Sequence, residues 1–378
     1  MLTKAYVVAE RGGPFEFVDV RLDKLQPSEV LVEMLFTGVC HTDIVVQHGG
    51  MPIGRFPAVL GHEGLGTVKE LGSGVSNPDL QVGDTVLLSF HTCRRCRGCL
   101  AKRYGSCLRM TESNFINTGR DKGITPNSPI SLPDGTPVHG QFFGQSSLSK
   151  IAVVSETSVV KITARSQDLV YLAPLSCGYL TGAGTVINVL QPRHDSRVVV
   201  LGMGAVGLAA MLAAKALGVK DVVAVDLAVE KLQLASSLGA THTINTKEAD
   251  LQAAIREVFP DGADYIVDTT GVAHLLQASI EALGHEGTLA LVGVPQPTVA
   301  LSFNALDLLL SCKRIIGVIE GFSNPQELIP KLLDLYYEGK FPIDKISTCY
   351  PARDLQQAVD DLKTSKVVKP VLSWADTQ

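Results

Sequence analysis

The sequence predicts an α/β protein in which a β-rich, barrel-like domain is joined to a doubly wound parallel sheet. Three observations predict this fold class. Up to about residue 165 the chain is divided into short segments by frequent Gly and Pro, and from about 170 continuous apolar strands alternate with helices. A glycine-rich turn at 202–207 joins the first of these apolar strands to its helix. The 378 residues suffice for two or three domains.

In the first half, apolar and polar residues alternate between closely spaced turn signals. This pattern predicts strands over 5–9, 29–36, 66–71 and 85–88 in a barrel-like arrangement. Between 114 and 139 the composition changes to Gly, Pro, Asn and Ser, which predicts a long surface loop.

In the second half, continuous apolar runs predict strands that are buried on both faces. We expect strands over 197–201, 222–225, 265–268 and 288–294, with helices over 205–217 and 230–238. Buried strands that alternate with helices indicate a parallel sheet covered on both sides. Two further helices, near 326–337 and 352–364, are expected to pack back on the first domain.

Composition and charge exclude several classes of partner. Hydrophobic residues make up 46% and charged residues 19%, as in an ordinary globular protein. The net charge of −5 argues against nucleic-acid binding, which needs a basic face. The uncharged stretch 198–214 contains glycines and is assigned to a strand, turn and helix, so no membrane segment is predicted. Residues 1–15 lack the pattern of a signal peptide, and we expect a cytoplasmic protein.

Four cysteines form the pattern C-x2-C-x2-C-x7-C at 93–107 and are flanked by Arg and Lys. Four thiolates at this spacing can surround Zn²⁺ as a closed tetrahedron, which is the pattern of a structural site. The cationic neighbours favour deprotonated thiols. A disulfide cluster is the alternative, and it is disfavoured because nothing else in the chain indicates secretion. The proposed ligands are Cys93, Cys96, Cys99 and Cys107.

The turn at 202–207 has the sequence G-M-G-A-V-G and follows a predicted strand. In this context the glycines permit a tight turn and close approach to a pyrophosphate at the helix N-terminus. Asp226 ends the next strand, where its carboxylate would bind a ribose 2′-hydroxyl and repel a 2′-phosphate. The motif therefore predicts a Rossmann domain that binds NAD in preference to NADP.

A second possible metal site is spread along the first half of the chain. Its candidate ligands are Cys40, His62 and Cys177, which come from the segments CHTD, GHE and LSCG. Two sulfurs and one imidazole leave a fourth position open, as in catalytic zinc sites, where the metal lowers the pKa of an alcohol oxygen. Spacing alone leaves open the alternative that these residues are ordinary core residues.

The segments together resemble the zinc-containing medium-chain alcohol dehydrogenases. The matching segments run in family order through nearly the whole chain: CHTD at 40–43, GHEGLG at 61–66, VGD at 82–84, the four-cysteine lobe, FFGQSS at 142–147, CGYLTGAG at 177–184, GMGAVG at 202–207 and LVGVP at 291–295. The resemblance implies a GroES-like catalytic domain of residues 1–178 and 322–378 and a Rossmann domain of residues 179–321. The substrate is expected in the cleft between them.

The resemblance also implies roles for individual residues. Cys40, His62 and Cys177 would hold the catalytic zinc, and Glu63 would bind it transiently during ligand exchange. Asp43 would orient the ring of His62. Thr42 would hydrogen-bond the substrate oxygen and accept its proton.

The remaining implied residues would contact NAD. Thr181 and Val206 would hold the nicotinamide, and backbone groups at Val292 and Val294 would bind its carboxamide. Lys231 would lie near the adenosine ribose. The other contacts would come from His41, Gly202, Gly204, Gly207, Asp226 and Lys369, of which His41 and Lys369 match positions that contact the pyrophosphate.

One position departs from the family pattern. Many members carry a histidine five residues after the first zinc cysteine, and Val45 stands there. The proton would then leave through Thr42, the ribose and water, or through His48. This apolar replacement and the GMGAVG motif are similar to the aryl- and allylic-alcohol branch of the family, such as benzyl alcohol and geraniol dehydrogenases. Val45, Phe90 and Val294 would line a suitable apolar pocket.

The sequence thus predicts an NAD-dependent enzyme that interconverts a primary alcohol and its aldehyde, with two zinc ions per subunit and a homodimeric or homotetrameric assembly. Two alternatives are kept. One is an aldehyde reductase of a biosynthetic pathway, with the glutathione-adduct branch as a variant that needs a cationic anchor. The other is a non-catalytic scaffold that binds zinc and nucleotide, which would require a broken catalytic site.

Overall fold

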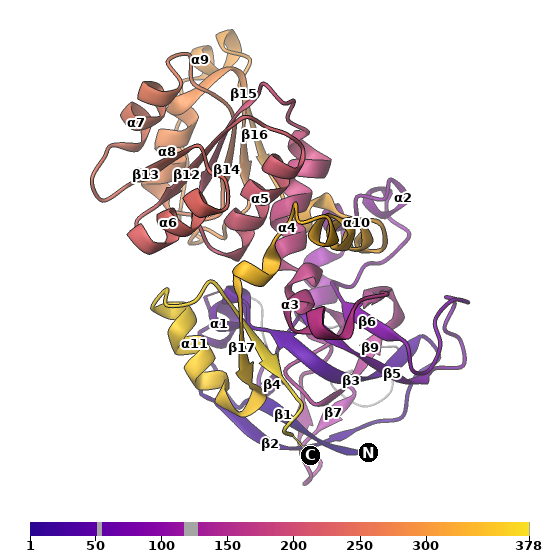
Figure 1. Cartoon of the computed structure of the whole chain (residues 1–378). Coiled ribbons are helices and arrows are strands. Elements are labelled where there is room, and N and C mark those ends of the chain that lie inside the picture. The colour runs from indigo at the N-terminus through magenta and orange to yellow at the C-terminus, as the bar shows by residue number, and fades with distance from the viewer. Residues whose placement is uncertain (51–54, 117–127, 378) are drawn as a thin grey trace. The chain divides into compact units, whose positions relative to one another are not determined.

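The computed structural model describes residues 1–50, 55–116 and 128–377 (Figure 1). The chain divides into two compact units. The first comprises Met1–Cys177, Pro325–Pro330 and Ile343–Gln378, and the second comprises Gly178–Asn324 and Lys331–Pro342. The predicted helix near 326–337 is α10, Pro325–Tyr337, and its residues are shared between the two units.

Two antiparallel sheets form most of the first unit. The smaller sheet has the strand order β4-β1-β2-β7-β8. The bounds of its strands are Leu2–Val8 for β1, Phe15–Leu22 for β2, Ala58–Val59 for β4, Ile130–Ser131 for β7 and Pro137–Val138 for β8. Apolar side chains of β1, β2, β7 and β8 form a buried core, which includes Val7, Val20 and Val138.

The larger sheet is built around β3, Glu29–Gly38, in the order β10-β6-β5-β3-β18-β17, with β9 also paired to β3. The other strands are β5 Gly64–Leu71, β6 Thr85–Leu88, β9 Ile151–Ser155, β10 Val159–Lys161, β17 Ser347–Pro351 and β18 Lys369–Ser373. The strands predicted over 5–9, 29–36, 66–71 and 85–88 are thus confirmed as β1, β3, β5 and β6. Because β18 pairs with β3, it returns the end of the chain to the centre of the first unit.

The surface loop predicted over 114–139 is wrong for most of its described part, although residues 133–137 are exposed. Residues 117–127 lie outside the described residues, but Asn114, Ser128 and His139 are buried. The strand β7 pairs with β2 and with β8, so this segment extends the smaller sheet. Strands of two residues are too short to give a periodic pattern in the sequence.

Short helical segments connect the strands of the first unit. The α-helices are α1 His41–Gln47, α2 Arg97–Leu100, α3 Leu169–Leu172 and α11 Leu355–Lys363. The 3₁₀ and π segments are η1 Tyr104–Ser106, η2 Glu112–Ile116, η3 Phe142–Gly144, η4 Glu156–Ser158, η5 Ser166–Asp168, η6 Ala173–Ser176, η9 Ile343–Lys345 and η10 Ala352–Asp354.

The second unit contains a parallel sheet in the order β13-β12-β11-β14-β15-β16, with helices on both faces (Figure 1). The strands are β11 Arg197–Leu201, β12 Asp221–Asp226, β13 His242–Asn245, β14 Ala263–Asp268, β15 Leu283–Leu291 and β16 Arg314–Gly317. The helices are α4 Gly178–Gly184, η7 Thr185–Leu190, α5 Ala205–Ala216, α6 Val229–Ser237, α7 Leu251–Val258, α8 Ala273–Ala282, α9 Ala305–Leu310 and η8 Glu320–Phe322. This is the doubly wound dinucleotide-binding order, and it confirms the predicted fold class.

The predicted strand over 288–294 ends earlier than expected, at Leu291 in β15. The backbone N–H groups of Val292 and Gly293 both donate to the carbonyl oxygen of Asp268, at 2.9 Å each. The chain therefore turns at the carboxyl end of the sheet, where ligands of such folds bind.

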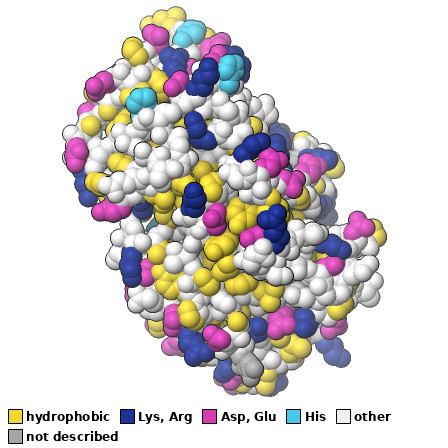
Figure 2. Space-filling view, in the orientation of Figure 1, with side chains coloured by type: hydrophobic (Ala, Val, Ile, Leu, Met, Phe, Trp, Pro, Cys, Tyr) yellow, Lys and Arg dark blue, Asp and Glu magenta, His cyan; other side chains and the backbone are white. Residues whose placement is uncertain are grey.

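Two features of the described residues concern membranes and nucleic acids as partners. No single helix in it is long and apolar enough to cross a bilayer, and one bent pair, Ser166–Ser176 with Gly178–Leu190, meets those criteria only when both halves are counted together. On the face drawn in Figure 2, Lys and Arg side chains are interspersed with Asp and Glu. Nucleic-acid binding would need a continuous basic face, which this surface does not present.

Candidate metal and cofactor sites

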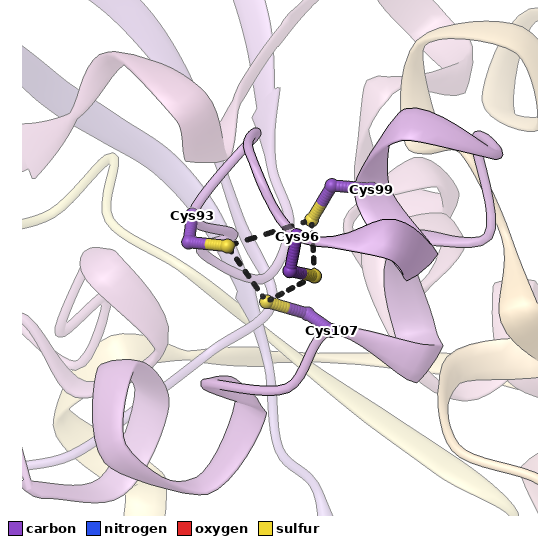
Figure 3. A group of neighbouring side chains, drawn as sticks. All are labelled: Cys93, Cys96, Cys99 and Cys107. Carbon is purple, nitrogen blue, oxygen red and sulfur yellow. Dashed lines mark hydrogen bonds between the residues drawn. The ribbon is translucent and has the colours of Figure 1, made fainter.

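The four cysteines of the 93–107 lobe converge on one point (Figure 3). The sulfur of Cys93 lies 3.8 Å from that of Cys99 and 3.5 Å from that of Cys107. The sulfur of Cys96 lies 3.6 Å from Cys99 and 4.0 Å from Cys107. A tetrahedron with zinc–sulfur distances of about 2.3 Å has edges of about 3.8 Å, so the four sulfurs fit a zinc ion. All eight cysteines of the chain are free thiols, which argues against the alternative of a disulfide cluster.

Backbone groups and cationic side chains support this lobe. Hydrogen bonds from the backbone at Cys99 and Leu108 lower the pKa of Cys96 to about 6, although burial raises the pKa of Cys99. The guanidinium of Arg94 lies over the ring of Tyr104 and donates to the carbonyl of Thr157. A closed set of four ligands leaves no position for a substrate, so this cluster can brace the fold but cannot perform catalysis.

A second cluster brings together Cys40, His62, Glu63 and Cys177, whose ligand atoms lie within 4.8 Å of one another. Cys40 is the residue before α1, and His62 with Glu63 precedes β5. Cys177 follows η6. The hydroxyl of Ser89 donates to the carbonyl of Ser176 at 2.6 Å and fixes the end of this segment. The residues predicted from the sequence as a second metal site are thus neighbours in space.

The carboxylate of Asp43 organises this cluster. Its Oδ1 accepts hydrogen bonds from Nδ1 of His62 and from the backbone N–H of Gly61, both at 3.0 Å. Its Oδ2 accepts from the backbone N–H of Cys40 at 3.2 Å. Because a carboxylate only accepts, the proton of a neutral His62 resides on Nδ1, and Nε2 carries a lone pair. Among the described residues this buried Nε2 has no hydrogen-bond partner, as expected for a metal ligand.

The electrostatics of the cluster favour a bound cation. The thiol of Cys177 and the positive charges nearby hold the pKa of Cys40 well below its usual range, although burial opposes this shift. Burial alone would lower the pKa of His62, but Asp43 and Cys40 raise it well above its usual value. The surroundings of Nε2 therefore stabilise positive charge, which a proton or a metal ion can supply.

Glu63 is fully buried beside these residues and is paired with Lys369. Lys369 donates from Nζ to Oε1 of Glu63 at 2.7 Å and to the carbonyl of Val39 at 3.2 Å. Burial raises the pKa of Glu63 to about 7, against the opposing effect of Lys369. A Cβ at Gly38 would clash with Oε2 of Glu63, so any larger residue there would displace the carboxylate. The sequence analysis did not predict the ion pair of Lys369, whose contact with a pyrophosphate stays a prediction.

Two phenylalanine rings pack against the imidazole of His62, and a third packs against both of them. Phe143 stacks on His62 with ring centroids 4.6 Å apart, and Phe142 meets it edge-on at 5.6 Å. Phe115 packs against both phenylalanines, at 5.7 Å and 5.0 Å. The sequence analysis included the segment 142–147 among its motifs but did not foresee this aromatic wall, because Phe115 lies far from it in sequence.

Gln145 is a second residue that the sequence analysis left without a role. Its side chain is fully buried; Oε1 accepts from the backbone N–H of Gly64, and Nε2 donates to the carbonyl oxygens of His62, Leu88 and Ser89. These bonds connect the start of β5 with the end of β6. Gln145 therefore fixes the backbone of His62 and of the residues that follow it.

Helix α1 carries the remaining predicted residues of the first unit. Thr42 is half-buried, with its hydroxyl 3.8 Å from the sulfur of Cys40. His41 is exposed and Val45 is half-buried. His48 follows the helix, is exposed, and has Nδ1 2.9 Å from the carbonyl of Ile44. Phe90, predicted to line the pocket, is buried.

The glycine-rich turn of the second unit has the geometry of a pyrophosphate cradle. Gly202 has a φ of 89°, and a Cβ at Gly207 would lie 1.7 Å from the carbonyl oxygen of Gly202. At Gly204 an added Cβ would meet no atom of the described residues within 4 Å, so a ligand can approach the backbone there. The first N–H groups of α5 point into this space without helical acceptors.

The carboxylate of Asp226 closes the turn at the end of β12. It accepts hydrogen bonds from the backbone N–H groups of Met203, Leu227 and Ala228, at 2.7 to 2.9 Å. Asp226 is half-buried, so its charge remains within reach of a ribose. Lys231 lies on the following helix, α6, and is half-buried.

The residues predicted for the nicotinamide end also lie together. A Cβ at Gly182 would clash with the carbonyl oxygen of Val206, so α4 touches the start of α5 at the residue that follows Thr181. The loop after β14 is held by Asp268, whose carboxylate accepts from Thr270 and from the backbone N–H of Gly271. A Cβ at Gly271 would meet the backbone of Val294 at 2.7 Å, so this loop packs on the exposed turn after Val292.

Comparison with known proteins identifies the family of the chain. Residues 26–164 match the family model described as the alcohol dehydrogenase GroES-like domain, and residues 205–338 match the model of zinc-binding dehydrogenases. The chain is 37% identical to geraniol dehydrogenase of Castellaniella defragrans over 370 residues, which cover 98% of this chain and 97% of the relative. The chain belongs to the zinc-dependent medium-chain alcohol dehydrogenase family.

Two solved structures resemble this alcohol dehydrogenase over nearly their whole length. Benzyl alcohol dehydrogenase of Acinetobacter calcoaceticus has a TM-score of 0.91 and 38% identity, covering 99% of this chain and all of the other. An alcohol dehydrogenase zinc-binding domain protein of Burkholderia ambifaria has a TM-score of 0.93 and 38% identity, covering 99% of both chains. The predicted family and the predicted activity, that of an alcohol dehydrogenase, are thereby confirmed.

Proposed function

We propose that this dehydrogenase oxidises a primary aromatic or allylic alcohol to its aldehyde with NAD, and that the reaction is reversible. The rings of Phe142 and Phe143, which pack on His62 and are joined by Phe115, are the observation that carries the substrate class. Flat apolar substrates bury well against such rings, and aromatic pairs gain additional stabilisation from edge-to-face contacts. Two relatives that carry the names geraniol and benzyl alcohol dehydrogenase support the same class.

Cys40, His62 and Cys177 would hold the catalytic zinc, and the four-cysteine lobe would hold the structural one. A zinc ion bound at the first site supplies Lewis acidity that lowers the pKa of an alcohol. Asp43 keeps the lone pair of His62 aimed at the cysteines, and Lys369 holds the carboxylate of Glu63 by an ion pair. Asp43 therefore orients a metal ligand, and Lys369 keeps the carboxylate of Glu63 near the metal position for ligand exchange.

Thr42 would accept the proton of the alcohol, since its hydroxyl lies beside Cys40. Val45 cannot relay that proton. His48 lies at the end of α1 with one ring nitrogen at the carbonyl of Ile44, so transfer through it would need a bridging water. The route through Thr42, the cofactor ribose and water is therefore the simpler proposal.

NAD would bind the second unit, with its pyrophosphate at Gly202, Gly204 and Gly207 and its ribose at Asp226. The open space at Gly204 and the charge of Asp226 support this assignment, because a 2′-phosphate would be repelled there. Thr181 and Val206 would hold the nicotinamide, and Val292 with Val294 its carboxamide. The same residues serve aldehyde reduction, so the alternative of a reductase concerns only the favoured direction.

We further propose a cytoplasmic homo-oligomer. Eight free thiols agree with a reducing compartment. On α9, which precedes the edge strand β16 in the chain, Leu306, Leu309 and Leu310 are at least 60% exposed. A group of exposed apolar side chains favours association with a second copy.

The substrate proposal is tested by initial rates with NAD on ethanol, hexanol, benzyl, cinnamyl and geranyl alcohols, each with and without a zinc chelator. We expect chelator-sensitive NAD reduction with kcat/KM for benzyl, cinnamyl and geranyl alcohols at least about tenfold above ethanol, because apolar contacts are gained in the pocket. Higher activity on ethanol would exclude the aromatic or allylic class. No turnover in either direction would instead favour the non-catalytic scaffold.

Zinc content distinguishes the two clusters. The wild-type chain is expected to hold about two zinc ions by elemental analysis, and Cys99→Ser and Cys177→Ser about one each. Cys99→Ser should also lower the melting temperature, because a structural metal contributes folding free energy. Cys177→Ser should lose activity with little change in melting. The exposed Cys349→Ser is the control, and a Cys99→Ser protein with wild-type zinc and melting would contradict the structural site.

Asp226 is tested by the preference between cofactors. Asp226→Asn removes the charge and keeps the size of the side chain, so we expect the ratio of kcat/KM for NAD to that for NADP to fall at least about tenfold. Asp221→Asn, at the opposite end of the same strand, is the matched control and should leave the ratio unchanged. An unaltered ratio in Asp226→Asn would show that Asp226 does not reach the ribose.

Sedimentation velocity tests the assembly. A single species at two or four chain masses is expected, and Leu309→Glu should shift it toward the monomer because a charge would enter the apolar contact. A wild-type monomer at micromolar concentration would contradict the proposal.

A further inference from the structure

Glu320 is a buried carboxylate that no part of the family pattern assigned. It begins η8, three residues after the end of β16, and only 6% of it is exposed. Its Oε2 accepts a hydrogen bond at 3.0 Å from the hydroxyl of Thr181, which is itself 9% exposed. The two residues are 139 positions apart in sequence, so the fold brings this contact about.

The backbone around Glu320 is held in an unfavourable conformation. Glu320, Gly321 and Phe322 have φ values of 50°, 59° and 49°, in the left-handed region that side chains other than glycine rarely adopt. Such strain persists where the surroundings fix the backbone, and it often accompanies function. Here Gly321 lies against Gly184 of α4, since a Cβ on either would approach the other within 3.0 Å. Asn188 also donates to the carbonyl of Gly321 at 3.1 Å.

Glu320 therefore has a fixed place relative to the nicotinamide end of the second unit. Thr181 precedes Gly182, which packs against the carbonyl oxygen of Val206 at the start of α5, so this turn of α4 lies beside the glycine-rich turn. A threonine in a helix commonly donates to a carbonyl one turn earlier, as Thr185 does to Thr181 at 2.7 Å. Thr181 donates to Glu320 instead, so the carboxylate fixes the rotamer of this side chain.

We propose that Glu320 is a specificity-determining residue whose charge raises the affinity of the site for the oxidised nicotinamide cofactor relative to the reduced one. This inference rests on the proposed function, in which Thr181 holds the nicotinamide. The oxidised ring carries a positive charge and the reduced ring is neutral. A carboxylate that is separated from the ring only by Thr181 therefore stabilises the oxidised form selectively. Because the carboxylate and Thr181 are both buried, the interaction is screened less than it would be in water.

The test is the ratio of two dissociation constants, measured without turnover. NADH is titrated by its fluorescence, and NAD by competition against NADH. Glu320→Gln keeps a hydrogen-bond acceptor for Thr181 but removes the charge, so we expect the ratio of the NAD constant to the NADH constant to rise about tenfold. Glu257→Gln, exposed at the end of α7, changes the net charge equally and should leave the ratio within about twofold.

Glu320→Asp keeps the charge, so its ratio of the NAD constant to the NADH constant should stay close to that of the wild type. If Glu320→Gln fails to fold, the pair Glu320→Asp and Glu320→Asn makes the same comparison at one side-chain length, with the same rise expected in the asparagine variant. A folded, charge-neutral variant with an unchanged ratio overturns this inference alone, because a purely structural role would alter melting without altering the ratio. A wild-type protein that binds neither NADH nor NAD overturns the proposed function and this inference with it.

Discussion

The cluster of Cys40, His62, Glu63 and Cys177 depends on one buried carboxylate, that of Asp43. It accepts hydrogen bonds from the backbone of Cys40, the backbone of Gly61 and the ring of His62, and it thereby connects the segment after β3 with the segment before β5. Without an acceptor at this point, the N–H groups would be buried unpaired and the imidazole could rotate. The tautomer of His62, and with it the availability of Nε2 for a metal, follows from this one side chain.

The same device recurs in the second unit. Asp226 accepts three backbone N–H groups at the glycine-rich turn, and Asp268 fixes the loop after β14. In each case a carboxylate at the end of a strand orders irregular backbone that a ligand would contact. Burial raises the pKa of Asp268, as it does that of Glu63, because the ionised form of each acid is less well solvated inside the protein.

Local patterns in the sequence sufficed for much of this account. Continuous apolar runs predicted β11 with its observed bounds, and cysteine spacing predicted the convergence of the four sulfurs. Contacts between distant segments were not predictable in this way: the pairs Lys369–Glu63 and Thr181–Glu320 are 306 and 139 residues apart. The two-residue strands β7 and β8 were missed because their pairing with β2, not their own pattern, defines them.

The most direct test of this account is a competition titration of zinc against a chelator for the wild type and Asp43→Asn. Asparagine keeps the size of the side chain but places an amide where Cys40 needs an acceptor. We expect the affinity of one zinc ion to fall about 10- to 100-fold while the four-cysteine zinc is retained unchanged. Wild-type affinity for both ions in Asp43→Asn would contradict the central role given to this carboxylate.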